Sequence, residues 1–334
     1  MRVLVLAFAS LAVAVPAAGG SHEASCPHDP SLGTVRFDRA AKAHAVSLAT
    51  CADRILGRAV PVVQRSLSSA DGRFLALVRA SGAGRTARQT IWVVDKRTRR
   101  SRPIASETQY YKQIGPGDTP GPIELLRFSA DDRWVLFTVD PGGSGSIAAD
   151  GLILHVVSTT GGRVSKLGIA LPYPDYVAGC GGGVVFAGGG DRVATHAKRL
   201  LVARPPSWRP HTLWADRTRS FGSLACAPDG RSVAVLSQRS SVDANFFATR
   251  WQLWRVALDG THTLLDRPPT GFADESPQWS RDGRSLLFVR ERNGYGQLML
   301  RLNANAIGPF AELGYSLGYY GHHAWRVRWS VGAE

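Results

Sequence analysis

Apolar and polar residues alternate in short runs along most of the chain, and one such run recurs. Each copy has a strand-like segment, a tight turn built on Asp-Gly or Asp-Asp, and a second apolar strand. Asp-Gly suits a hairpin turn because glycine accepts a positive φ, and alternating Val, Leu and Phe have the two-residue period of a strand. The four copies are LSSADGRFLALV from Leu67, FSADDRWVLFTV from Phe128, CAPDGRSVAVLS from Cys226 and WSRDGRSLLFV from Trp279; a degraded fifth, CGGGVVF from Cys180, replaces the turn with glycines.

A second type of hairpin alternates with the first and also consists of an apolar strand, a polar turn and another strand. Five copies follow the first-type hairpins and begin at Thr90, Leu152, Arg199, Trp251 and Gln297. A sixth begins at Ala43 and has no first-type hairpin before it. Its missing partner is predicted at the other end of the chain, where Tyr319 to Ser330 has the pattern of a hairpin with nothing after it.

The spacing of these hairpins indicates a ring of four-stranded units. The turn aspartate recurs at positions 71, 131, 229 and 282, at steps of 60, 98 and 53 residues, and the middle step holds two repeats of 49. Propeller blades are about 40 to 50 residues long. The sequence therefore predicts an all-β fold, a single six-bladed β-propeller over residues 27–334, in which strands from both chain ends complete one blade.

The segment from Ser276 to Leu300, SPQWSRDGRSLLFVRERNGYGQLML, resembles the WD40-like repeat of TolB-type β-propellers. That repeat has the pattern proline, tryptophan, serine, Asp-Gly and an apolar strand. The resemblance extends from about residue 30 to residue 334 and is weakest in the glycine-rich copy and in the shared blade. It implies a β-propeller fold.

The N-terminal residues and the cysteines both indicate export. Residues 1–18 combine one arginine, an apolar stretch from Val3 to Val15 and the small-residue end Pro-Ala-Ala, which predicts a signal peptide and a secreted or cell-envelope location. No later segment has the roughly 18 unbroken apolar residues of a membrane span. Four cysteines in an exported chain allow three pairings. We predict Cys26 with Cys51, which are close in sequence, and Cys180 with Cys226, which occupy matching columns of neighbouring repeats.

The net charge of +14 comes from 40 basic against 26 acidic residues, and nearly all of the basic ones are arginine. Guanidinium groups favour polyanions, so an arginine-driven polyanion binder is one interpretation. The alternative, which we favour, is charge dispersed over a solvated surface, with no specific nucleic-acid partner.

Two patterns resemble catalytic or metal sites. Gly314 to Gly318 matches GxSxG, the nucleophile elbow of α/β hydrolases, which needs a strand, a sharp turn and a helix. Only 16 residues follow, with Glu334 as their sole acid, so we interpret the motif as a connection between blades. The pair His322 and His323 is interpreted as polar turn residues, of which at most one could bind a given ion from a strand. No CxxC and no histidine at ligand spacing from a cysteine occur, so no metal and no cofactor are predicted.

Tyrosines concentrate in the segments that link one predicted blade to the next, which crowd one rim of a propeller. Tyrosine offers a large contact area with a polar tip, as sugar or peptide recognition requires. Alternatively, the phenols only seal the linkers against the blades, and the neighbouring acids form structural hydrogen bonds. The predicted binding residues are Tyr110, Tyr111, Tyr173, Tyr176, Asp274, Glu275, Tyr315, Tyr319 and Tyr320.

Together these features predict an exported, monomeric, non-enzymatic binding module that contacts an envelope or extracellular protein or glycan through its linker face. Two alternatives remain. One is a propeller-type glycan hydrolase or lyase, for which Asp118, Asp175 and Glu275 are the candidate carboxylates. The other is the arginine-driven polyanion binder, which predicts a steep loss of affinity with salt.

Overall fold

The computed structural model describes residues 26–59, 66–82, 88–108, 123–140, 151–242, 250–303, 305–316, 320–323 and 325–330. The predicted signal peptide, residues 1–18, lies outside these ranges. The described part of the chain consists of antiparallel strands and two short 3-10 helices, without an α-helix, so the all-β prediction is confirmed. Nothing helical in these ranges is long and apolar enough to cross a membrane.

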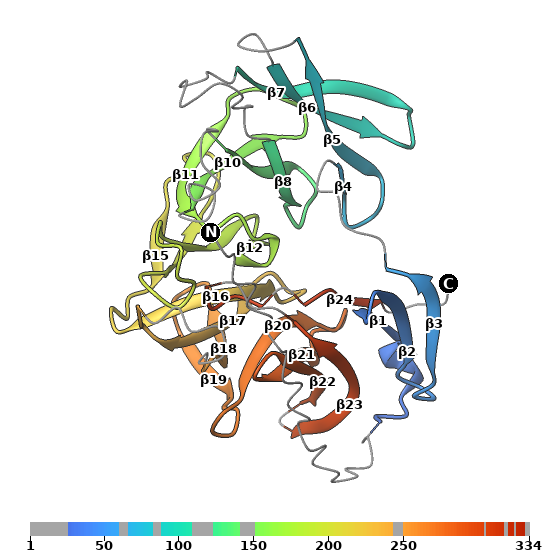
Figure 1. The fold of residues 1–334 in the computed structure, drawn as a ribbon. Coiled ribbons are helices and arrows are strands. Elements are labelled where there is room, and N and C mark those ends of the chain that lie inside the picture. The colour runs from blue at the N-terminus through green and yellow to red at the C-terminus, as the bar shows by residue number, and fades with distance from the viewer. Residues whose placement is uncertain are drawn as a thin grey trace, which may run out of the picture.

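The sheets follow one another in chain order around an arc, and the N-terminal strands lie beside the C-terminal strand (Figure 1). The sheet that joins the two ends has the strand order β24-β1-β2-β3. The prediction that both chain ends complete one sheet is therefore confirmed. The hairpin predicted at residues 319–330 is wrong: the described part of that segment supplies one strand, and the N-terminal side supplies three. These strands are β1 (Thr34–Arg39), β2 (Lys42–Ser47), β3 (Asp53–Arg58) and β24 (Val327–Ser330).

Three further sheets each contain four consecutive antiparallel strands. In each, a first-type hairpin supplies the first two strands and a second-type hairpin the last two, as the alternation of repeats predicts. The strands are β4 (Ser66–Ser68), β5 (Phe74–Ser81), β6 (Arg88–Asp95) and β7 (Arg100–Thr108); β16 (Arg219–Cys226), β17 (Ser232–Arg239), β18 (Gln252–Ala257) and β19 (His262–Asp266); β20 (Ala273–Trp279), β21 (Ser285–Arg292), β22 (Tyr295–Leu302) and β23 (Asn305–Tyr315).

The remaining eight strands form one sheet made of two four-stranded sets. The sets meet at a single paired position, Ala170 with Gly188. The structure thus has five sheets where the repeats predict six blades, and this one bridge accounts for the difference. The strands are β8 (Ile123–Phe128), β9 (Trp134–Val139), β10 (Leu152–Ser158), β11 (Ser165–Ala170), β12 (Val177–Cys180), β13 (Gly183–Gly188), β14 (Arg199–Ala203) and β15 (His211–Trp214).

The hydrophobic core lies between neighbouring sets of strands. One cluster of buried side chains joins β4–β7 to β8–β10, and a second joins β8–β11 to β12–β14. A third runs from β12 to β22, and a fourth joins β21–β23 to β1, β2 and β24. No cluster of described residues joins the first sheet to β4–β7. The first strands β4, β8, β12, β16 and β20 contact one another in succession, so the linkers that precede them converge.

Two disulfides join the cysteines in the predicted pairs. Cys26 and Cys51 have their Cα atoms 5.9 Å apart and hold the N-terminal stretch against the end of β2. Cys180 and Cys226, with Cα atoms 5.5 Å apart, connect β12 to β16. The second disulfide therefore joins the first strands of two neighbouring sets.

Candidate functional site

Side chains from two linker segments and from strand β16 meet where the first strands converge. Tyr173 is the N-cap of the short 3-10 helix η3 (Pro174–Tyr176) before β12, and Asp175 lies within that helix. His322 lies in the segment that leads to β24. The rings of Tyr173 and His322 stack with centroids 3.9 Å apart and an interplanar angle of 7°. His322 Nε2 lies 3.1 Å from Asp175 Oδ2, and the hydroxyl of Ser223, from β16, donates a hydrogen bond to the same oxygen. We call Tyr173, Asp175, Tyr176, Ser223 and His322 the linker cluster.

Local features of the sequence place these side chains. Proline at the first position of η3 sets the backbone for a helical turn. In β16 the pairing with β17 shifts between Phe221 and Leu224, so Ser223 lies in an irregularity of the kind that redirects a side chain. Glycine at position 222 leaves room for the neighbouring ring, because a Cβ there would make a tight contact of 3.2 Å with the indole of Trp251.

The electrostatics of the linker cluster favour an ionised carboxylate. Burial opposes the charge on Asp175, but the neighbouring His322 and the Ser223 hydroxyl outweigh it, and the pKa of Asp175 is lowered. About a third of the Asp175 side chain remains exposed. Burial, with Asp175 nearby, raises the pKa of Tyr176 well above its usual value, so this phenol stays neutral.

The order of hydrogen bonds argues against a nucleophile of the serine-hydrolase type. Such a nucleophile needs the hydroxyl to donate to the imidazole, which the carboxylate orients from the other side. Here the carboxylate of Asp175 stands between Ser223 and His322, and no hydrogen bond joins those two described residues directly. The arrangement instead fixes an aromatic pair and one partly exposed carboxylate in a rigid position.

The predicted acids Asp274 and Glu275 are both buried in β20. Asp274 has no exposed area and accepts a hydrogen bond of 2.9 Å from Arg290. Glu275 is 2% exposed and accepts one of 3.2 Å from the indole of Trp325. Burial raises the pKa of Asp274 to about 8, and burial together with Glu291 raises that of Glu275 well above its usual value. Neither acid faces an open cleft, as a glycosidase-type pair would.

The structure brings some of the predicted tyrosines together and separates others. Tyr173 and Tyr176 both lie against His322. Tyr176 is only 1% exposed, so Tyr173 is the one of the two that a ligand could reach. Tyr320 lies under the guanidinium of Arg192, and its carbonyl accepts a hydrogen bond from the amide of Ala194. Tyr315 lies at the end of β23 and packs on Tyr295, 5.2 Å between centroids. Three of the predicted tyrosines and one candidate acid fall outside the described residues: Tyr110, Tyr111, Tyr319 and Asp118.

Sequence reasoning missed His322 and Ser223 as members of this site. Both histidines of the pair are buried, at 6% and 1% exposure, and are not the polar turn residues that the sequence suggested. Two consecutive histidines just before the last predicted strand could have indicated His322 as a site residue. Ser223 had none, because its role depends on a shift of register.

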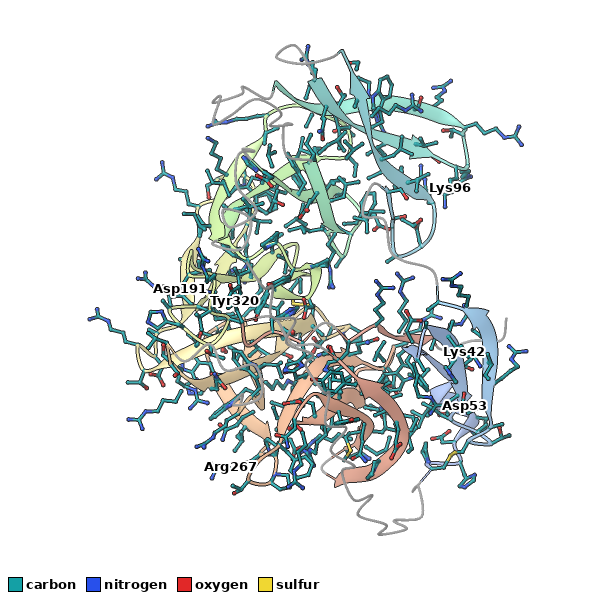
Figure 2. All side chains as sticks on the ribbon, viewed as in Figure 1. Lys42, Asp53, Lys96, Asp191, Arg267 and Tyr320 are labelled. Carbon is teal, nitrogen blue, oxygen red and sulfur yellow. A yellow bond between two sulfur atoms is a disulfide. The ribbon has the colours of Figure 1, made fainter. Side chains whose placement is uncertain are left out.

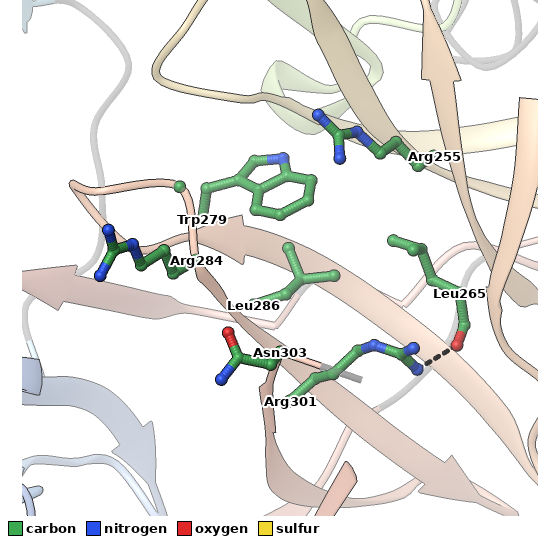
Figure 3. A pocket seen from close by; sticks show the side chains of 8 residues that line it. Arg255, Leu265, Trp279, Arg284, Leu286, Arg301 and Asn303 are labelled. Carbon is green, nitrogen blue, oxygen red and sulfur yellow. Dashed lines mark hydrogen bonds between the residues drawn. The ribbon is translucent and has the colours of Figure 1, made fainter. Parts of the chain in front are cut away.

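A second concave region lies at the opposite end of β20, beside the Asp-Gly turns. It has a volume of about 260 Å³ and brings Arg255, Arg284 and Arg301 around the indole of Trp279 (Figure 3). Arg301 donates a hydrogen bond to the carbonyl of Leu265, and the Arg255 guanidinium lies 5.8 Å from the Trp279 ring. Elsewhere charged side chains are spread over several sheets, as Lys42, Lys96 and Arg267 illustrate (Figure 2).

Comparison with solved structures finds folds similar to this chain at low sequence identity. The chain is similar to TolB from Acinetobacter baumannii, with 15% identity over 89% of this chain and 67% of that one and a TM-score of 0.48. It is similar to a TolB from Agrobacterium tumefaciens, with 14% identity over 89% and 98% of the two chains and a TM-score of 0.49. It is also similar to an oligogalacturonate lyase from Vibrio parahaemolyticus, with 12% identity over 87% and 80% and a TM-score of 0.45.

No family model and no curated protein matches this chain. The similar structures carry names of different kinds, TolB and a lyase among them. These likenesses concern the propeller fold alone, and the function has to be argued from the sites of this chain.

Proposed function

We propose that this chain is an exported, non-enzymatic binding module that holds a protein or glycan ligand on its linker face. The observation that carries the proposal is the stacked pair of Tyr173 and His322, anchored to the partly exposed carboxylate of Asp175. An aromatic face beside a fixed hydrogen-bond acceptor suits the ring of a sugar or the backbone and side chain of a peptide. Two disulfides support an oxidising, exported location.

The enzymatic alternative is less well supported. Glu275 is buried, and Asp175 is held by His322 and Ser223, so these two candidate carboxylates do not flank a shared open space. A hydrolase or lyase would need a free acid and base on opposite sides of a substrate.

The polyanion alternative is favoured by one observation, the groove around Trp279. Three guanidinium groups beside an indole could hold an anionic ligand with an apolar portion. Such binding weakens steeply as salt rises, because screened charge contributes most of the attraction.

The test is a binding screen of the full, disulfide-bonded chain against envelope glycans, anionic polymers and exported proteins at low and at high salt. We expect a ligand whose binding survives high salt, and we expect Tyr173→Ala to weaken it at least tenfold, which corresponds to the loss of about 1.4 kcal/mol. The matched control is Tyr295→Ala, which removes a tyrosine that is 60% exposed and lies outside the linker cluster.

Two results would contradict the proposal. If Tyr173→Ala binds every discovered ligand as the parent does, the linker cluster is not the contact surface. If all binding disappears at high salt and is lost with Arg284→Ala instead, the arginine groove is the binding site.

A further inference from the structure

Behind the linker cluster lies a buried group of ionisable side chains, Glu275, Glu291 and His323, that the proposed function does not use; we call it the Glu-Glu-His cluster. Glu275 from β20, Glu291 from β21 and His323 from the segment before β24 are 2%, 1% and 1% exposed. Each offers one ligand atom, and these three atoms lie within 4.8 Å of one another. The strand pairing explains the approach of the two acids: Glu291 is paired with Ala273, two residues before Glu275 and on the same face of the sheet.

One carboxylate oxygen of the Glu-Glu-His cluster has no hydrogen-bond partner. Glu275 Oε2 accepts from the Trp325 indole, but Glu275 Oε1 is buried and makes no hydrogen bond. Buried carboxylate oxygens are ordinarily satisfied, since an unsatisfied one loses its hydration without compensation. Glu291 Oε2 is oriented by the amide of Gly294, at 2.8 Å.

The two acids of the Glu-Glu-His cluster make it attractive to a cation. The carboxylate oxygens that Glu275 and Glu291 offer lie within 4.8 Å of each other, and both side chains are buried. The nearby guanidinium of Arg290 is held by Asp274 and Asp266. Two carboxylates brought together in a water-excluded space repel each other unless a proton or a positive ion lies between them.

We propose that Glu275, Glu291 and His323 bind one divalent first-row metal ion, Zn²⁺ or Mn²⁺, that fastens the C-terminal segment to β20 and β21. Two carboxylate oxygens and one imidazole nitrogen are ligands that both ions accept, whereas Ca²⁺ takes six to eight oxygens. His323 precedes β24, the strand that pairs with β1. The ion would therefore stabilise the junction of the two chain ends, independently of any ligand on the linker face.

The experiment uses the full chain without a histidine tag, treated with a chelator and then given Zn²⁺, Mn²⁺ or Ca²⁺ in separate samples. Metal content after gel filtration and the melting temperature are measured together. We expect one Zn²⁺ or Mn²⁺ per chain and a melting temperature raised by about 5 °C at saturation, with no response to Ca²⁺. Glu275→Gln and His323→Gln should each lose the ion and the thermal response.

Two control variants make the result specific. Glu312→Gln removes an exposed carboxylate of β23 and should bind the ion as the parent does. His28→Ala tests the other group of donors near one another, Cys26, His28 and Cys51, and should also leave binding unchanged. Circular dichroism shows whether each variant is folded; if Glu275→Gln is not, His323→Gln decides.

The proposal is overturned if the parent binds no Zn²⁺ or Mn²⁺, or if Glu275→Gln and His323→Gln retain the ion, or if His28→Ala alone loses it. A parent that binds nothing, together with a Glu275→Gln variant that melts higher, would show that a proton on Glu275 fills the role given to the metal.

Discussion

A serine two residues before the turn aspartate organises three of the Asp-Gly-type turns. The hydroxyl of Ser280 donates to Asp282 Oδ1 at 2.6 Å and accepts from the amide of Ser285 at 2.9 Å. Asp282 also accepts from the amide of Arg284 at 3.0 Å. The pattern repeats at Ser69 with Asp71 and at Ser129 with Asp131, again at 2.6 Å. In the fourth turn Ala227 stands in the place of the serine, and only the bond from Arg231 to Asp229 remains.

Ser280→Ala should lower the free energy of unfolding by about 1 to 2 kcal/mol, because the buried amide of Ser285 loses its side-chain partner. The Ser280 hydroxyl and the Arg284 amide lower the pKa of Asp282 in the folded state. A lowered folded pKa contributes stability above the unfolded value of about 3.9, and this contribution is lost as the pH falls below it. Urea unfolding should therefore show a smaller cost of Ser280→Ala at pH 2.5 than at pH 7.

The reverse change, Ala227→Ser, is the control for this interpretation. It should restore the missing hydroxyl beside Asp229 and raise stability by about 0.5 to 1 kcal/mol. An equal cost of Ser280→Ala at both pH values, together with no gain from Ala227→Ser, would show that the hydroxyls do not stabilise these turns.

At the scale of elements, the glycine-rich copy of the repeat owes its composition to close packing. A Cβ at Gly179 would lie 2.4 Å from the amide nitrogen of Ala130, and one at Gly183 would lie 2.5 Å from the carbonyl oxygen of Ala203. Both contacts are to backbone, which cannot move aside cheaply. At these two positions β12 and β13 approach their neighbours too closely for a side chain, which accounts for the glycines there.

The disulfide between Cys180 and Cys226 stabilises this closely packed region. It closes a segment of 46 residues, against 25 for Cys26 and Cys51. The chain-entropy relation gives a contribution of about 4 kcal/mol for the longer loop and about 3.5 kcal/mol for the shorter one. Replacing Cys180 and Cys226 together by alanine should reduce the free energy of unfolding, measured in urea, by about 4 kcal/mol. A reduction below about 1 kcal/mol would mean that packing alone holds β12 to β16.

Most first-type hairpins were predictable because their turns carry Asp-Gly or Asp-Asp. Strand β1 was missed, since the turn that follows it carries no such pair. The turn between β1 and β2 contains Ala40 and Ala41, with φ of 49° and 59°. Sequences usually place Asn-Gly or Asp-Gly in such a turn, since alanine adopts positive φ at a cost. The alternation of Val35 and Phe37 inside β1 was visible, but without a turn signal it did not indicate a strand that pairs with β24.

The candidate site was predictable only in part, for the same kind of reason. Two of the linker tyrosines, Tyr173 and Tyr176, do lie against His322, but the sequence indicated only polar turn residues for the histidine pair. In the structure His322 lies against Asp175, and a ring nitrogen of His323 lies within 4.8 Å of carboxylate oxygens of Glu275 and Glu291. Which linkers meet is decided by the order of sheets around the molecule, and that order brings together residues 147 positions apart, such as Asp175 and His322.

At the scale of the whole molecule, closure depends on how the last sheet holds β24. The side chain of Gln278, in β20, bonds the backbone of β24 twice: Nε2 donates to the carbonyl of Val327 at 2.7 Å, and Oε1 accepts from the amide of Trp329 at 3.0 Å. The Trp329 indole in turn donates to the carbonyl of Leu32. Among the described residues, the core clusters link the first sheet only to β21–β23 and not to β4–β7. The first sheet is therefore held from one side.

Gln278→Ala should loosen this one-sided attachment without unfolding the other sheets. Two lost hydrogen bonds to the backbone of Val327 and Trp329 correspond to about 1.5 to 3 kcal/mol, or at least a tenfold increase in local opening. Hydrogen exchange followed by mass spectrometry should show faster exchange in peptides that cover β1 and β24 and unchanged exchange in β16–β19. The control is Gln297→Ala on β22, whose side chain makes no recorded hydrogen bond in the described part of the chain. Faster exchange across all sheets would instead mean that the ring opens as one cooperative unit. The first sheet would then not open more easily than the others.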